Sequence, residues 1–404
     1  MIKRIPVNEL VPKMFLTDLN FDGVVHGDIP KTGVLEDQLV IDDIQKLGVQ
    51  YVYIDTAKGP DSKSSVSIHQ LDRSLEKELA TLTASEVEAP TLVDWNDEMV
   101  RAVPLYDEAQ KVMTALIQEM KDKKQLTNLA VAEKIAKKII DSTARNRDVL
   151  ICLGTVRNKA KYIQQHSINL AVLMSVFTRF LSIKAEAIEQ AVLGALLHDL
   201  GKVFIPKQIS DKPGALTDSE FATMKKHVAL TNAILEKTSG LSETALQVAT
   251  QHCERVDGSG YPQGLAGKDI SVFGRMIGIL DVYDAITNDR SFRERLAPGE
   301  ALKKLLQWSE TTFDKQLVHG FIKCLGIYPT GSMVFMESNH LGVVIQQNPD
   351  HKLEPIVKCF FLLKPKGFIS PKIIDLSKKI NDDKILKAVD PRAFKIKVED
   401  FILN

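Results

Sequence analysis

Apolar residues recur at helical spacing through the middle of the chain, with charged residues on the opposite faces. From about residue 95 to residue 306 this pattern predicts a mostly helical region. Thr217 and Glu220 have the spacing of a capping box, which predicts the start of a helix that carries His227. The other helices predicted in this region are 106–120, 129–140, 166–181, 187–200 and 273–286.

The two ends of the chain have a different pattern. Residues 40–47 place apolar side chains on one helical face, and 49–54 are rich in β-branched and aromatic residues, which predicts a small α+β unit. Residues 56–67 contain a glycine, a proline and four serines, the composition of a linker. Near the C-terminus the predicted strands are 333–336, 341–345 and 356–363.

A chain of 404 residues is too long for one ordinary core, so we predict a multi-domain fold. A small α+β N-terminal regulatory domain would cover residues 1–65, followed by a linker over 66–100. A central all-α domain would cover 101–330, and a small β-rich C-terminal module 331–404.

Charge and composition narrow the class of protein. Lys+Arg and Asp+Glu both number 52, which weighs against a nucleic-acid polymer as partner. No apolar run approaches the roughly 20 residues that span a bilayer, and the first residues lack the apolar stretch of a signal peptide. We therefore expect a cytoplasmic protein whose four cysteines are free thiols.

A histidine and an aspartate follow the apolar run 195–197 directly. Burying His198 and Asp199 is costly unless something compensates them, and a metal would, because imidazole binds one ion and a carboxylate can bridge two. A buried histidine satisfied by hydrogen bonds explains this pair alone equally well. Lys202 would share the face of His198 on a continuing helix, where its charge could meet a phosphate.

A second polar string begins at His252 and ends at Pro262. Its glycines permit a tight turn and its proline fixes the exit, and core packing requires no such string. Further along, Asp281 and Asp284 share one helical face, and Asp281 interrupts an otherwise apolar helix. Two solvated acids are the alternative interpretation, which the nearby candidate ligand histidines make the weaker one.

Together these strings resemble the HD-GYP branch of the HD superfamily. The spacing also matches, with 32 residues from His166 to His198, 29 on to His227, 25 on to His252 and 29 on to Asp281. The resemblance covers roughly residues 100–330. Residues 1–60 more loosely resemble the small N-terminal domain often fused to HD-GYP domains.

The resemblance implies an all-α HD-superfamily domain that hydrolyses cyclic di-GMP to the linear dinucleotide, or on to GMP. It also implies a centre of two or three iron or manganese ions, with Asp199 bridging two of them. The implied metal ligands are His166, His198, Asp199 and Asp281 for one ion, and Asp199, His227, His252 and Cys253 for the second.

The resemblance implies catalytic and substrate-binding residues as well. Asp199 and Lys202 are the candidate catalytic residues. Two cations would lower the pKa of a bridging water and stabilise the departing oxygen, while basic side chains offset the phosphate charge. The residues matching nucleotide-binding positions are Lys202, Tyr261, Asp284, Arg290 and Arg293.

Two positions depart from the family pattern. Family members with three metals have a glutamate where this chain has Tyr162, so we expect at most two metals. The family usually has a second histidine where this chain has Cys253. A thiolate suits zinc or iron better than manganese, so zinc joins iron and manganese as a candidate.

The cysteine leaves three outcomes open. Cys253 could coordinate and change the metal preference, it could weaken the second metal and slow hydrolysis, or the domain could be a cyclic di-GMP receptor that does not cut. We favour the active hydrolase because the other motif residues are intact. A signalling protein partner and a homodimer both stay open.

Overall fold

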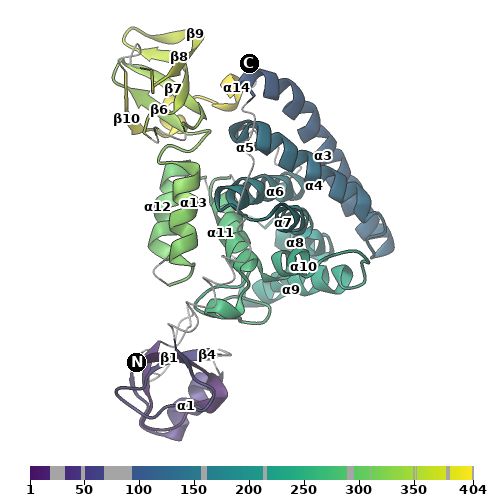
Figure 1. Cartoon of the computed structure of the whole chain (residues 1–404), viewed down its shortest axis with the longest axis vertical. Coiled ribbons are helices and arrows are strands. Elements are labelled where there is room, and N and C mark those ends of the chain that lie inside the picture. Colours follow the sequence, from purple (N-terminus) through teal and green to yellow (C-terminus); the bar gives the residue numbers. More distant parts are fainter. Residues whose placement is uncertain are drawn as a thin grey trace.

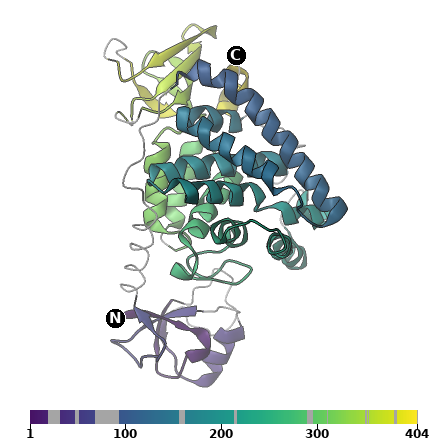
Figure 2. The same ribbon diagram turned by 45° about the vertical axis from the view of Figure 1, so that its right-hand side comes forward.

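We analysed a computed structural model of the chain. It describes residues 1–18, 32–46, 51–67, 93–155, 162–212, 216–288, 295–309, 311–348, 351, 353–378 and 383–402. In Figures 1 and 2 a small sheet lies at each end of a central group of helices. The helical centre and two flanking modules agree with the predicted fold class, whereas the domain limits at 65, 100 and 330 stay predictions.

Helix α6 (Tyr162–Phe180) lies in the middle of the helical part and packs against α3, α4, α5, α7 and α11. Every residue from 165 to 178 is buried, because helices surround it. The bounds are α3 Trp95–Lys123, α4 Leu129–Arg145, α5 Arg147–Gly154, α7 Ala185–Leu197, α8 Lys207–Ser210, α9 Asp218–Leu235, α10 Glu243–Gln251, α11 Val272–Ile286, α12 Pro298–Trp308 and α13 Lys315–Leu325.

The N-terminal sheet has the strand order β3-β2-β4-β1-β5 and its own hydrophobic core. The linker predicted over 56–67 is wrong at its end, because β5 pairs with β1 there, Lys3 opposite Ser67. Two of the serines that suggested a linker, Ser62 and Ser64, donate hydrogen bonds to Glu9, in the 3-10 turn that follows β1. The elements are β1 Ile2–Pro6, β2 Phe15–Asp18, β3 Gly33–Val34, α1 Gln38–Lys46, β4 Tyr51–Asp55 and β5 Val66–Ser67.

The C-terminal sheet is antiparallel, with the order β10-β6-β7-β8-β9. The three predicted strands are confirmed as β6 (Met333–Met336), β7 (His340–Gln346) and β8 (Ile356–Leu363). Strands β9 (Lys366–Asp375) and β10 (Ile385–Ala388) were not predicted, because most of their residues are exposed and lack an apolar alternation. The short helix α14 (Glu399–Ile402) follows.

The two faces of this sheet belong to different cores. Met333 and Val343 join the main hydrophobic cluster of the helices, whereas Val334 and Val344 belong to a separate cluster. Successive residues of a strand point to opposite faces, so each strand serves both clusters. The C-terminal module is therefore packed onto the helices by one face.

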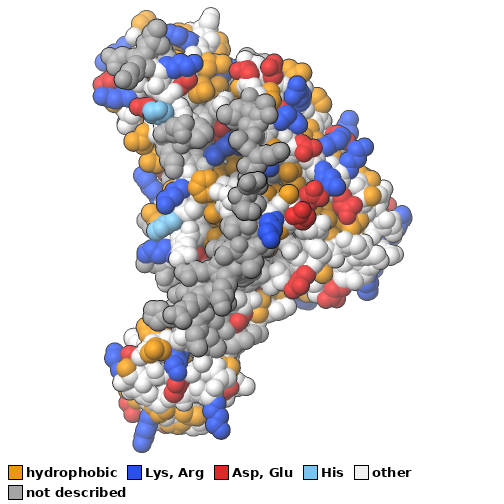
Figure 3. All heavy atoms as spheres, in the orientation of Figure 1, with side chains coloured by type: hydrophobic (Ala, Val, Ile, Leu, Met, Phe, Trp, Pro, Cys, Tyr) orange, Lys and Arg blue, Asp and Glu red, His pale blue; other side chains and the backbone are white. Residues whose placement is uncertain are grey.

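No helix in the described ranges is both long and apolar enough to cross a membrane. On the face drawn in Figure 3, basic and acidic side chains are interspersed over the helical part and both end modules.

A buried aspartate ties the helices to the C-terminal module. Asp148 on α5 is 2% exposed, and its carboxylate accepts hydrogen bonds from the Thr330 hydroxyl (2.7 Å) and the Gln347 N–H (3.0 Å). Burial raises the pKa of Asp148, because the ionised carboxylate loses its contact with water there. Both donors come from the segments around β6 and β7, so this one side chain joins parts of the chain far apart in sequence.

Replacing Asp148 by alanine is expected to destabilise the folded chain by about 2–4 kcal/mol, because two buried donors lose their acceptor. Urea unfolding followed by circular dichroism measures this change. Asp107→Ala, at an exposed position of α3, is the matched control and should shift stability by less than about 0.5 kcal/mol. Equal midpoints for the two variants would contradict the assigned role of Asp148.

Candidate metal centre

The histidine–aspartate pair lies where a helix stops. The predicted helix 187–200 ends earlier, at Leu197, and a 3-10 turn follows over Leu200–Phe204. Gly201 lets this turn pack closely against α9, because a Cβ there would lie 2.1 Å from the His227 carbonyl oxygen. The Gly201 N–H donates to the Thr231 hydroxyl (2.9 Å), so the turn is fixed against α9.

Lys202 consequently does not share a continuing helix with His198, as the spacing predicted. Its amino group instead lies 2.5 Å from Asp199 Oδ2, with the side chain 20% exposed. The turn directs the lysine back to the carboxylate, so its charge lies at the centre of the site.

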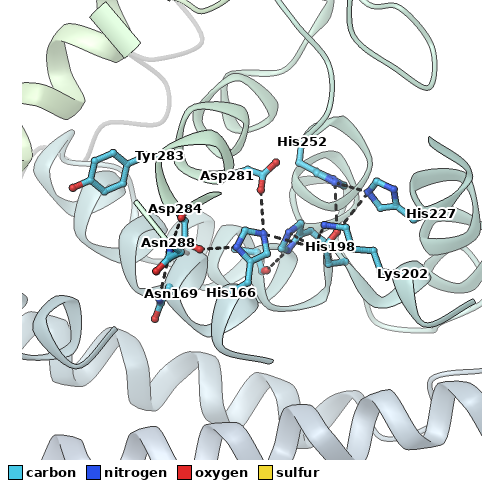
Figure 4. Close-up of polar contacts among 12 residues, drawn as sticks. His166, Asn169, His198, Lys202, His227, His252, Asp281, Tyr283, Asp284 and Asn288 are labelled. Carbon is cyan, nitrogen blue, oxygen red and sulfur yellow. Dashed lines mark hydrogen bonds and ion pairs between the residues drawn. The ribbon is translucent and has the colours of Figure 1, made fainter. Parts of the chain in front are cut away.

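Four imidazoles from four parts of the fold come together in Figure 4, and all four lie within 4 Å of the Asp199 carboxylate. His166 comes from α6, His198 and His252 follow the ends of α7 and α10, and His227 comes from α9. The Nε2 atoms of His166 and His198 lie 3.6 and 3.3 Å from Asp199 Oδ2, and those of His227 and His252 lie 3.5 and 3.8 Å from Oδ1. Each carboxylate oxygen therefore faces its own pair of histidines.

The hydrogen bonds of the other ring nitrogens define the tautomers. His198 Nδ1 lies 2.8 Å from the Ala195 carbonyl, and His227 and His252 have the same contact with the carbonyls three residues before them, at 2.7 and 2.9 Å. A carbonyl oxygen only accepts, so each Nδ1 carries a proton, and in its neutral form each ring directs an Nε2 lone pair at Asp199.

A cation would satisfy these converging lone pairs. His227 Nε2 and His252 Nε2 lie 3.2 Å apart, and with both protons on Nδ1 nothing bonds them to each other. Within the described residues, His198 Nε2 and Asp199 Oδ1 are buried without a hydrogen-bond partner. Metal–nitrogen bonds of about 2.0–2.1 Å place two ligand nitrogens of one ion roughly 3 Å apart, so the residues fit bound metal.

The pKa directions agree with this arrangement. Burial raises the pKa of Asp199, but the neighbouring His198 and Lys202 outweigh it and hold the pKa well below its usual range. Burial lowers the pKa values of His198 and His252, which favours the neutral form of both rings. An ionised carboxylate among neutral imidazoles is the state that binds a metal.

His166 is surrounded by more negative charge. Burial lowers its pKa, but Tyr162, Asp281 and Asp284 raise it, to about 10. Its Nε2 lies 3.0 Å from Asp281 Oδ1. Burial raises the pKa of Asp281, and the His166 hydrogen bond and charge more than reverse this. A cation at this point would replace the proton on His166.

The candidate ligands form two groups. His166, His198 and Asp199 make one, with ligand atoms within 4.8 Å of one another, and His227, His252 and Cys253 make the other to the same limit. Asp281 joins the first group through His166. The structure thus brings together every residue that the sequence analysis named as a metal ligand, and Cys253, 6% exposed, lies with the second group.

Asp284 lies behind the site. We predicted a substrate contact, but the residue is 3% exposed and its Oδ2 lies 2.7 Å from His166 Nδ1. Asn169 donates to Asp284 Oδ1 (3.3 Å) and to the Gly154 carbonyl (3.0 Å), and accepts from the Tyr106 hydroxyl (3.1 Å). This chain fixes the ring of His166 and directs its Nε2 inward, so Asp284 is a positioning residue.

The glycine-rich segment forms a tight loop around Glu254. This carboxylate, 3% exposed, accepts from the Gln263 N–H (2.8 Å) and the Leu265 N–H (3.0 Å). A Cβ at Gly260 would lie 2.4 Å from the Glu254 Cα and the Arg255 nitrogen, so only glycine fits there. The sequence alone indicates no role for Glu254, because no feature of the neighbouring residues shows that the loop folds back onto this carboxylate.

Tyr261 lies beside the second ligand group. Its ring centroid is 6.2 Å from that of His227. Burial raises its pKa well above the usual range, with the neighbouring Cys253 adding to this, so the hydroxyl stays protonated. Arg290 and Arg293, the other predicted nucleotide contacts, lie outside the described residues.

Replacing Asp284 by alanine is expected to weaken metal affinity about 10- to 100-fold, because the ring of His166 loses the partner that orients it. Metal titration against a competing chelator measures the change. Asp284→Asn should fall between the parent and Asp284→Ala, since an amide oxygen still accepts from Nδ1 but carries no charge. Unchanged affinity in Asp284→Ala would show that His166 needs no such partner.

Comparison with known proteins gives the family. The HD domain family matches residues 151–317, and a domain of unknown function, DUF3391, matches residues 2–131. A cyclic di-GMP phosphodiesterase of Pseudomonas aeruginosa is 32% identical over 387 residues, 96% of this chain and 92% of the relative. A 3′3′-cGAMP-specific phosphodiesterase of Vibrio cholerae is 33% identical over 171 residues, 42% of this chain and 37% of the relative.

Among solved structures, an HDGYP protein of Bdellovibrio bacteriovorus aligns with 80% of this chain and 98% of that chain, at 17% identity and a TM-score of 0.48. The match to the Pseudomonas relative runs along almost the whole of both chains. The chain therefore belongs to the HD-GYP family of cyclic di-GMP phosphodiesterases.

Proposed function

We propose that this chain hydrolyses a phosphodiester bond of cyclic di-GMP to give the linear dinucleotide. The observation that carries the proposal is the buried Asp199 carboxylate, whose two oxygens face separate pairs of histidine Nε2 atoms. A carboxylate so placed can bridge two metals. The near full-length relative is named for the same reaction.

In this proposal His166, His198, Asp199 and Asp281 hold one metal, and Asp199, His227, His252 and Cys253 hold the other. Iron and manganese are the expected metals, with zinc suited to the cysteine ligand. When bound, two cations supply a nucleophilic water at neutral pH and stabilise the charge on the attacked phosphate and leaving oxygen. Tyr162 stacks on the His166 ring with centroids 5.5 Å apart and offers no carboxylate for a third ion.

The chain's own groups orient the substrate beside this centre. Among the described residues, Lys202 is the one lysine or arginine that an ion pair joins to Asp199, and its partial exposure lets it reach a phosphate. Tyr261 contributes a ring beside the second ligand group. Arg290 and Arg293 complete the proposed nucleotide contacts. We also propose a cytoplasmic location, in keeping with this substrate.

Replacement of His198 tests the proposed metal centre directly. His198→Ala is expected to lower kcat/KM for cyclic di-GMP by at least about 100-fold and to reduce the metal bound per chain, because one ligand is lost. His319→Ala, at an exposed position of α13, is the matched control. Product analysis and metal content are measured on the same anaerobic preparations. Tight nucleotide binding by the parent without any linear product would instead make the chain a receptor.

Cysteine 253 sets the metal preference. Cys253→His is expected to raise manganese-supported kcat/KM about tenfold or more relative to iron, because imidazole suits manganese better than a thiolate does. Cys152→Ala, which changes a buried cysteine of the helical core, is the control. The ratio of manganese- to iron-supported activity measures the effect, and an unchanged ratio would remove Cys253 from the ligands.

A further inference from the structure

An exposed aromatic side chain lies near the metal centre. Phe221 on α9 is 44% exposed. Its ring meets the Tyr261 ring edge-on, with centroids 6.1 Å apart and an interplanar angle of 86°. The ring is thus set against the glycine-rich loop with nearly half its surface open to solvent.

A lysine lies over the same two rings. Lys225, one helical turn after Phe221, places its amino group 4.7 Å from the Phe221 centroid and 5.7 Å from that of Tyr261. We call Phe221, Lys225 and Tyr261 the aromatic–lysine wall. Because Tyr261 also contacts the His227 ring, the wall continues directly into the second ligand group.

The wall is held in place by the start of α9. Thr217 and Glu220 form a complete capping box, and Lys212 pairs with Glu220 at 2.5 Å. The hydrogen bonds and the ion pair fix the first turn of the helix, from which Phe221 projects. An aromatic face fixed next to a catalytic centre binds a planar ligand at little cost in conformational entropy.

We propose that the aromatic–lysine wall recognises a guanine base of the substrate, with Phe221 stacking on the ring and Lys225 bonding the O6/N7 edge. This inference rests on the proposed function, because it takes the nucleotide to be bound for cleavage at the adjacent centre. Stacking on an aromatic ring tolerates any base. An ammonium group donates to the two acceptors of guanine, whereas adenine presents an amino donor at the same edge.

Substitutions of the two residues are therefore expected to affect nucleotide binding differently. Loss of Phe221 weakens binding of guanine and adenine nucleotides alike, while loss of the Lys225 charge weakens guanine alone. Lys202, paired with Asp199, remains the phosphate contact. Tyr261 is shared between the wall and the centre, so it is left unchanged in the test.

The experiment uses the full-length, metal-loaded protein with cyclic di-GMP as substrate and cyclic di-AMP as competitor. Phe221→Ala is expected to raise the KM for cyclic di-GMP and the Ki of cyclic di-AMP about 5- to 100-fold each, with kcat within about twofold. Phe221→Tyr, which keeps the ring, should restore both. Lys225→Met should raise the KM about 5- to 50-fold and leave the Ki within about twofold.

Two matched controls lie on helix surfaces. Lys226→Met changes the adjacent exposed lysine of α9, and Phe180→Ala removes a 40% exposed ring at the end of α6. Both should match the parent, and all variants should retain the parent's metal content. If Lys225→Met raises the KM and the Ki equally, the lysine contacts phosphate and the guanine assignment is overturned. If Phe221→Ala changes neither constant, the stacking assignment is overturned.

The experiment distinguishes a failure of the proposed function from a failure of the guanine assignment. A parent protein that forms no linear product disproves hydrolysis. Dissociation constants of both nucleotides, measured by calorimetry on the same variants, then take the place of KM and Ki. The same ratios would support guanine recognition, and equal losses or none would overturn it.

Discussion

One buried carboxylate constrains the rest of this structure. Asp199 is 1% exposed, lies within 4 Å of four imidazole Nε2 atoms and pairs with Lys202. An ionised group so far from water is tolerated only where opposite charge compensates it, and one lysine does not satisfy the converging nitrogen lone pairs as well. Cations shared by the four histidines and Asp199 would compensate both, and their binding would then be coupled to folding.

Several groups around the Asp199 carboxylate fix the orientation of the side chains that face it. Backbone carbonyls orient three of the imidazoles, and the Asp284–Asn169 pair orients His166. The glycine-rich loop closes on Glu254 and brings Tyr261 beside Cys253. The backbone carbonyls, Asp284, Asn169 and Glu254 need not contact the substrate, but they determine which imidazole and loop atoms face it. The aromatic–lysine wall of Phe221, Lys225 and Tyr261 lies next to these groups, because Tyr261 belongs to both the wall and the glycine-rich loop.

The C-terminal module is connected to the same network through one short helix. Asp148 of α5 accepts hydrogen bonds from Thr330 and Gln347, and the Gly154 carbonyl at the end of α5 accepts from Asn169. The helix therefore contacts the C-terminal module at one end and the support of His166 at the other. Since one face of the C-terminal sheet also joins the main hydrophobic cluster, the helical part is incomplete without it.

The sequence by itself determined the types and order of the candidate ligands and most of the helices around them, because helical periodicity and residue identity are local properties. It did not predict α10, which ends just before His252. It also predicted the capping box at Thr217 and three of the C-terminal strands, whose signals lie within a few residues. Only tertiary structure decided that Asp284 orients His166 from behind, that α7 ends at Leu197 and that Lys202 turns back to Asp199. The edge strands likewise depend on pairing with distant partners: β9 and β10 are mostly exposed and leave no apolar pattern to detect, and β5 has only two residues. Each of these outcomes comes from contacts between segments far apart in the chain, which spacing along the sequence does not record.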